Sequence, residues 1–310
     1  MGKATREAYG DALRDVGAEI KDIVVLDADL SKSTKTAVFA KAHPDRFFNV
    51  GIAEQNLMGT AAGLAAAGKI PFVSTFAMFA AGRAFEQVRN SICYPKLNVK
   101  IAATHAGLTV GEDGASHQAI EDISLMRSIP NMTVIVPADA TEARKAVEFA
   151  AKYKGPVYLR LGRSSTPDIF GDSYEFEHGK AVQLADGKDL TIIATGIMVA
   201  PARKAAEELI EMGISARVLN IHTIKPIDKE AIAKAAQETG AIVTCEEHSI
   251  IGGLGSAVAE VIVESTPVPL ERVGVMDTFG ESGKPDALLV KYHLTTADIV
   301  KAAKRVISRK

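Results

Sequence analysis

Gly51-Ile-Ala-Glu54-Gln55 and Gly111-Glu-Asp-Gly-Ala-Ser-His117 decide the fold of this 310-residue chain. The first stretch places a carboxylate at the start of a helix of small residues, shortly after a glycine that permits a tight turn. The second is an acidic, glycine-rich loop that follows a predicted strand ending near Ala103. Open parallel sheets bind ligands beyond the carboxyl ends of their strands. The two stretches therefore predict an α/β fold with a site at that edge.

The first half of the chain alternates short β-branched runs with longer helical patterns, which is typical of parallel sheets joined by crossover helices. We expect strands at 23–26, 71–74, 99–102, 133–136 and 157–159, and helices near 4–18, 54–67, 78–93 and 139–152. This pattern predicts one α/β domain over residues 1–162.

A stretch rich in turn formers, residues 163–189, is predicted to be a linker. Beyond it we expect strands at 190–194, 216–219, 241–244 and 272–275, and helices near 199–212, 228–238, 255–264 and 296–307. Gly252-Gly-Leu-Gly255 lacks the lysine and hydroxyl residue of a phosphate-binding loop, so we expect the turn that starts a helix. The pattern predicts a second, smaller α/β domain over residues 190–310.

Composition and charge exclude several classes of protein. The chain is 47% hydrophobic and 24% charged, as globular proteins are, and its 36 basic and 38 acidic residues create no net field that favours nucleic acid or a membrane. The N-terminus carries charges where a signal peptide needs an apolar core, so we expect a cytoplasmic protein. Cys93 and Cys245 lie far apart beside apolar runs, which predicts reduced core thiols.

Glu54, Phe76 and Phe79 are candidates for holding a buried ring. Glu54 could approach a ligand in a dry site, although a glutamate in the first turn of a helix is also favoured by the helix dipole. The two phenylalanines follow a predicted strand and could stack on a flat ring, or they could simply pack in the core. The residues alone leave both interpretations open.

The candidates for proton transfer are His105, Asp113 and His117. Imidazoles and a carboxylate on one flexible loop can line a site with groups that donate and accept hydrogen bonds and move protons. No compact ligand spacing supports a metal site there. Cys245-Glu-Glu-His248 could be drawn as half of a metal site, but no second ligand pair accompanies it. We therefore interpret that segment as structural.

Six segments together resemble transketolases in order and spacing. They are Gly51-Ile-Ala-Glu-Gln-Asn-Leu-Met-Gly59, Ser74-Thr-Phe-Ala-Met-Phe79, Thr104-His105, Val110-Gly-Glu-Asp-Gly-Ala-Ser-His-Gln118, Ile129-Pro-Asn-Met132 and Val136-Pro-Ala-Asp139. The resemblance runs from Ala4-Thr-Arg6 to Asp277-Thr-Phe-Gly280 and so covers essentially the whole chain. It implies a parallel-sheet thiamine diphosphate pyrimidine-binding domain followed by a smaller α/β transketolase C-terminal domain.

The resemblance also implies roles for individual residues toward the cofactor. Glu54 matches the glutamate that hydrogen-bonds the aminopyrimidine ring, Phe76 and Phe79 match the aromatic pocket around it, and Asp29 matches a carboxylate near the thiamine linkage. The family pattern has a tyrosine three residues beyond the second aromatic. This chain has Gly82-Arg83-Ala-Phe85 and one residue more, so we expect Phe85 to supply the third ring.

Substrate contacts follow from the same resemblance. The residues that match those binding the donor ketose hydroxyls and assisting proton movement are His105, Asp113 and His117. The residues that match phosphate contacts at the channel mouth are Arg6, Ser33 and Arg163. An arginine suits this task because its planar fork pairs bidentately with phosphate. The implied reaction moves a two-carbon ketol group from a ketose phosphate to an aldose phosphate through a thiamine diphosphate carbanion.

The diphosphate-binding half of a transketolase is missing from this pattern. That half carries Gly-Asp-Gly and a later Asn and holds the diphosphate through Mg²⁺. Here Gly111-Glu-Asp-Gly114 lies in the substrate loop, and Gly171-Asp-Ser173 lacks the final glycine. The resemblance therefore implies the C-terminal subunit of a split transketolase, with the Mg²⁺ ligands on a separate N-terminal subunit, no metal ligands of its own, and assembly as an α2β2 heterotetramer.

Three alternatives remain. Two are thiamine diphosphate enzymes, a 1-deoxy-xylulose-5-phosphate synthase-like protein and a 2-oxo acid dehydrogenase β-type subunit, to which the altered aromatic pattern is similar. The glycine-histidine loop favours transketolase over both. The third is a non-catalytic regulatory paralogue, which the joint retention of Glu54, His105, Asp113 and His117 disfavours.

Overall fold

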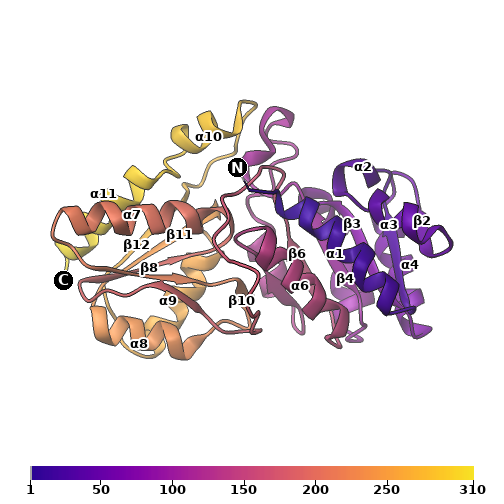
Figure 1. The fold of residues 1–310 in the computed structure, drawn as a ribbon, viewed down its shortest axis with the longest axis horizontal. Coiled ribbons are helices and arrows are strands. Elements are labelled where there is room, and N and C mark those ends of the chain that lie inside the picture. The colour runs from indigo at the N-terminus through magenta and orange to yellow at the C-terminus, as the bar shows by residue number, and fades with distance from the viewer. Residues whose placement is uncertain (1) are drawn as a thin grey trace.

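The computed structural model describes residues 2–310, which form two sheets side by side, each covered by helices on both faces (Figure 1). Most strands pair in parallel, and helices make the crossovers between them. The predicted α/β architecture with two sheets is confirmed. Within residues 2–310, no helix is both long and apolar enough to cross a membrane.

The first sheet has seven strands in the order β10-β5-β6-β4-β3-β1-β2. Its strands are β1 (Ile23–Asp27), β2 (Phe47–Asn49), β3 (Ile70–Phe76), β4 (Lys100–Thr104), β5 (Thr133–Ile135), β6 (Val157–Arg160) and β10 (Thr223–Lys225). Alternate residues of β1 enter different cores, with Ile23 and Val25 on one face and Val24 and Leu26 on the other. Both faces are therefore buried, as a parallel sheet requires.

Helices cover the two faces of the first sheet. Its helical segments are α1 (Thr5–Glu19), α2 (Ser31–Thr34), α3 (Ala37–Ala42), η1 (Pro44–Arg46), α4 (Glu54–Ala66), η2 (Phe79–Arg83), η3 (Gln87–Cys93), η4 (Leu108–Asp113), α5 (Asp122–Ser128) and α6 (Ala140–Lys152). Helices α1 and α6 run side by side over one face, where Leu13 and Val147 join its core (Figure 1). Helix α4, η3 and α5 supply Leu57, Ile92 and Ile123 to the opposite core.

The second sheet has five strands in the order β12-β11-β8-β9-β7. Its elements are β7 (Val182–Ala185), β8 (Leu190–Ala194), η5 (Gly196–Met198), α7 (Val199–Glu211), β9 (Ala216–Asn220), α8 (Lys229–Thr239), β11 (Ile242–Ser249), α9 (Leu254–Glu264), β12 (Leu270–Val275), α10 (Pro285–Lys291) and α11 (Thr296–Ile307). Ile192 packs with α7 and α11, whereas Ile193 packs with α8 and α9 on the other face (Figure 1).

The turn at Gly252-Gly-Leu-Gly255 starts a helix, as expected, because α9 begins at Leu254. The buried Glu246 accepts hydrogen bonds from the amides of Leu254 and Gly255, at 2.7 and 2.8 Å. A carboxylate at a helix N-terminus satisfies amides that have no partner within the helix. Glu246 in Cys245-Glu-Glu-His248 is therefore structural. Both cysteines are free and buried.

The structure differs from the expected elements in several strands and helices, and the short helices α2, α3, α5 and α10 were among the elements not predicted. The three-residue strands β2 and β10 and the strand β7 were not predicted, because runs this short show no clear alternation. Strand β7 lies within 163–189, where a linker is expected. Strand β10 lies within 190–310 but pairs antiparallel with β5 and so completes the first sheet. The helix expected over 78–93 is instead two π-helical segments, η2 and η3.

A buried charge pair lies where the two halves meet. Arg160 of β6 donates from Nε to both carboxylate oxygens of Asp122 in α5, at 3.1 and 2.9 Å. Its Nη2 donates to the carbonyls of Ala119 and Glu247, at 3.2 and 2.9 Å, and Glu247 belongs to β11 of the second sheet. The hydroxyl of Tyr158 donates to the same Asp122 at 2.8 Å. Arg160 Nε and Nη2 are therefore both paired, and the bond to the Glu247 carbonyl links the first sheet to the second.

Asp122→Ala should lower the free energy of unfolding by about 3–5 kcal/mol, because it leaves the Arg160 guanidinium buried and uncompensated. Urea unfolding of the single variant and of Asp122→Ala/Arg160→Met measures this loss, and the double variant should recover much of it. Lys229→Ala, which breaks an exposed pair with Glu264, is the control and should change little. A loss in Asp122→Ala no larger than in the control would contradict the role assigned to the buried pair.

Candidate functional site

The candidate site assembles where three neighbouring parallel strands end together. In β1 and β3, Asp27 is paired with Ser74, and in β3 and β4, Phe76 is paired with Thr104. The segments that follow these strands therefore leave the sheet at one edge. This register brings Phe76 and Phe79, from the end of β3, beside His105, which follows β4.

Four aromatic rings form one cluster at this edge. The Phe76 ring stacks on His105 with centroids 3.9 Å apart and lies 6.0 Å from Phe79. His117 meets Phe79 and Phe76 edge-on, at 5.3 and 6.3 Å. The structure thus brings two of the three predicted cofactor aromatics, Phe76 and Phe79, into one cluster with both predicted substrate histidines.

Glu54 is the first residue of α4, and its side chain is 2% exposed. The chain enters this helix through Gly51, whose φ of +74° suits glycine. Arg83 donates from Nη1 to Glu54 Oε2 at 3.0 Å, and its guanidinium carbon lies 4.7 Å from the centroid of the Phe79 ring. A buried carboxylate and an aromatic ring that share one planar cationic partner fit a flat ring that carries nitrogen hydrogen-bonding groups. Arg83 was not among the predicted site residues.

His105 is held in a specific protonation state. Burial lowers its pKa to about 3, and the nearby charges of Arg6 and Arg163 act in the same direction. Arg6 Nη1 lies 3.3 Å from His105 Nε2, and because arginine can only donate, Nε2 accepts. The other nitrogen, Nδ1, then carries the proton and donates to Thr104 Oγ1 at 2.9 Å. His105 is therefore a neutral ring with a defined tautomer at physiological pH.

The predicted phosphate residues lie around His105. Arg6 donates to the backbone carbonyl of Ser33 at 2.8 Å, so these two residues meet through the main chain. Arg163 donates to the Val110 carbonyl and pairs with Glu112 at 3.1 Å, both in or beside the glycine loop. Arg6 therefore lies beside His105, and Arg163 lies beside the glycine loop that leads to His117.

Three other predicted residues lie apart from the ring cluster. Asp29 is exposed, with a positive φ of 64°, and accepts from Asn49 Nδ2 at 3.1 Å. Asp113 is exposed at the end of η4. Phe85 is half-buried and packs against the core shared with α4 and η3. For these three residues the contacts with a ligand stay predictions.

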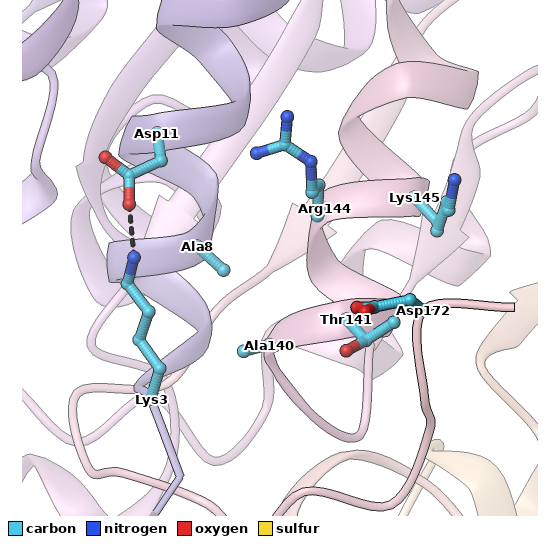
Figure 2. A pocket seen from close by; sticks show the side chains of 8 residues that line it. All are labelled: Lys3, Ala8, Asp11, Ala140, Thr141, Arg144, Lys145 and Asp172. Atoms are coloured by element: carbon cyan, nitrogen blue, oxygen red, sulfur yellow. Dashed lines mark hydrogen bonds and ion pairs between the residues drawn. The ribbon is translucent and has the colours of Figure 1, made fainter. Parts of the chain in front are cut away.

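A cavity of about 300 Å³ lies elsewhere, between α1 and α6 (Figure 2). Its lining includes Lys3, Asp11, Arg144 and Asp172 but none of the predicted site residues. Lys3 pairs with Asp11, and Arg144 pairs with Asp15 at 2.7 Å, so these cations already have carboxylate partners. This cavity is not part of the candidate site. Over residues 2–310, no group of three or more His, Cys, Asp or Glu side chains is arranged to hold a metal ion.

Two known protein domains match this chain, and together they cover almost all of it. The transketolase pyrimidine binding domain matches residues 1–168, and the transketolase C-terminal domain matches residues 179–299. The chain belongs to the transketolase family. The resemblance read from its motifs is therefore confirmed.

Relatives of this transketolase-family chain include proteins of the same extent. The putative transketolase C-terminal section of Methanocaldococcus jannaschii is 55% identical over 302 residues, which are 96% of this chain and 95% of that protein. A solved structure described as a split gene transketolase, inactive beta4 tetramer, is 62% identical with a TM-score of 0.94, and each chain is covered completely. Transketolase of Homo sapiens is 38% identical over 310 residues, which span 99% of this chain but 49% of the human protein.

The ring of His105 should stay neutral down to about pH 5, because its pKa is lowered to about 3 by burial and neighbouring cations. Nitrogen-15 NMR of imidazole-labelled protein follows this directly, with His105→Gln used to assign the signals. Since the unfolded chain binds a proton near pH 6.5 and the folded chain does not, stability should rise with pH between about 3 and 6.5 at this position. A His105 midpoint above pH 6 would contradict the environment described here.

Proposed function

We propose that this transketolase-family chain is one subunit of a split transketolase that transfers a two-carbon ketol group from a ketose phosphate to an aldose phosphate. The observation that carries the proposal is the buried Glu54, joined through Arg83 to Phe79, in a ring cluster that also holds Phe76 and two histidines. This is the arrangement that a pyrimidine ring on one side and a sugar on the other require. The protein would act in the cytoplasm, in pentose phosphate metabolism.

In this proposal the cofactor is thiamine diphosphate, and Glu54 holds its aminopyrimidine ring through a carboxylate kept out of water. Phe76 and Phe79 supply the aromatic faces against which the ring packs. Bound thiamine diphosphate would supply the carbanion chemistry of the reaction, as cofactors do for reactions that side chains cannot perform. Asp29 and Phe85 would complete the cofactor surroundings.

Sugar binding would fall to the opposite side of Phe76. Nε2 of neutral His105, which accepts from Arg6 in the structure, would accept from a ketose hydroxyl once Arg6 turns to the substrate phosphate, and so would orient the sugar without adding a charge. His117 and Asp113 would bind further hydroxyls and move protons. Arg6 and Arg163, with Ser33, would hold the phosphate at the mouth, where guanidinium groups pair well with phosphate oxygens.

The second half of the site would come from another chain. The M. jannaschii relative named a C-terminal section and the structure named a split gene transketolase are matched end to end, which supports a separate N-terminal subunit. That partner would carry the Mg²⁺ ligands and grip the diphosphate. We propose an α2β2 heterotetramer in which each site lies between unlike chains.

The purified chain alone should transfer no ketol groups, and co-expression with the diphosphate-binding chain of the same organism should restore transfer. The assay is xylulose 5-phosphate with ribose 5-phosphate, with pyruvate as a parallel donor for the related thiamine enzymes. In the complex, Glu54→Gln should reduce kcat by about a hundredfold or more, since it removes a charge placed against the reacting cofactor. The matched control is Glu264→Gln on the far domain, which should retain activity.

Full turnover by the isolated chain would contradict the division of the site between two subunits. Turnover with pyruvate but not with xylulose 5-phosphate would contradict the ketol transfer. Near-normal kcat in Glu54→Gln would contradict the role of the carboxylate.

A further inference from the structure

Arg83 makes the two contacts that a cofactor ring in this site would make. Its Nη1 donates to the Glu54 carboxylate at 3.0 Å, and its guanidinium lies over the Phe79 ring, 4.7 Å from the centroid. Across residues 2–310, this is the one side-chain hydrogen bond that the Glu54 carboxylate receives. Arg83 therefore satisfies a carboxylate that would otherwise be buried without a partner.

The guanidinium and an aminopyrimidine share the relevant chemistry. Both are planar, both direct nitrogen hydrogen-bonding groups along one edge, and both stack on aromatic faces. Two planar groups cannot lie on the same face of Phe79 and against the same carboxylate edge together. The side chain of Arg83 is 51% exposed, whereas that of Glu54 is 2% exposed. The arginine can therefore withdraw toward solvent, while the carboxylate stays in place.

The local backbone explains how Arg83 reaches this position. Residues Phe79–Arg83 form the π-helical segment η2. A π-helical turn takes up an extra residue within a helix, and such turns occur frequently at functional sites. The η2 segment thus holds the Arg83 guanidinium over the ring of Phe79, its own first residue.

We infer that Arg83 is a displaceable stand-in for the aminopyrimidine ring, which keeps Glu54 paired in the cofactor-free chain and withdraws when the ring binds. This inference rests on the proposed function, because it takes thiamine diphosphate as the ligand. Arg83 is a positioning residue that sets the affinity for the cofactor. In the free enzyme, the binding-competent population is the fraction of molecules whose arginine has withdrawn, and the apparent Kd rises as that fraction falls.

The test is the Kd of thiamine diphosphate with Mg²⁺, measured by isothermal titration of the complex with its diphosphate-binding chain. Arg83→Leu should lower the Kd by about tenfold, because every molecule is then open to the ring. Arg83→Lys keeps the charge and part of the pairing, so its Kd should lie between those of Arg83→Leu and the wild type. The matched control is Arg14→Leu, which removes an arginine paired with Asp15 at 2.8 Å on α1, and its Kd should equal that of the wild type.

An unchanged or higher Kd in Arg83→Leu would overturn the inference, and a higher Kd would make Arg83 a support for the bound ring. Thermal melting of each variant without cofactor establishes that it is folded, and Arg83→Gln replaces Arg83→Leu if the latter does not fold. The ketol transfer assay separates this inference from the proposed function. A tighter Kd with no ketol transfer would overturn the function and leave the arginine's role intact. An unaltered Kd with normal transfer would overturn the arginine's role alone.

Discussion

The buried pair between Arg160 and Asp122 is the interaction on which the arrangement of this molecule depends. A guanidinium in the protein interior is costly unless it is paired with a carboxylate and hydrogen-bonded, and here the partners come from α5, from Ala119 and from β11 of the second sheet. The carbonyl of Ala119 also accepts from the Gly107 amide at 2.9 Å, so the glycine-histidine loop is closed upon itself beside the arginine. The second sheet therefore helps to hold the glycine-histidine loop in place, because Arg160 bonds both Glu247 of β11 and the Ala119 carbonyl that closes the loop.

Glu247 shows how closely the two halves fit. Its carboxylate accepts from the Thr109 amide at 2.6 Å, which ties β11 to the start of η4. A Cβ added to Gly107 would lie 2.2 Å from the carboxyl carbon of Glu247, and Gly107 has a φ of +80°. Only glycine meets both conditions. The terminal half of the chain thus contributes to the site indirectly, by shaping the loop that carries Asp113 and leads to His117.

The sequence predicts the parts of this structure that depend on regular periodicity. The strands at 23–26, 71–74 and 99–102 were found because β-branched runs alternate with helices, and their shared edge explains why Phe76, Phe79 and His105 meet. Arg160 could not be predicted, because a charged residue at a strand end usually faces solvent and its burial arises from partners far along the chain. Arg83 was missed because its position depends on a π-helical turn that has no sequence period of its own. Strand β10 was missed because it joins the sheet of the other half.

The central claim is that this chain supplies the pyrimidine side of a site completed by a different subunit. Isothermal titration of thiamine diphosphate with Mg²⁺ tests this most directly, using this chain alone, the diphosphate-binding chain alone, and an equimolar mixture. We expect saturable binding in the mixture, with one cofactor for each pair of unlike chains, and no comparable binding by either chain alone. Binding by this chain alone as tight as that of the mixture would contradict it.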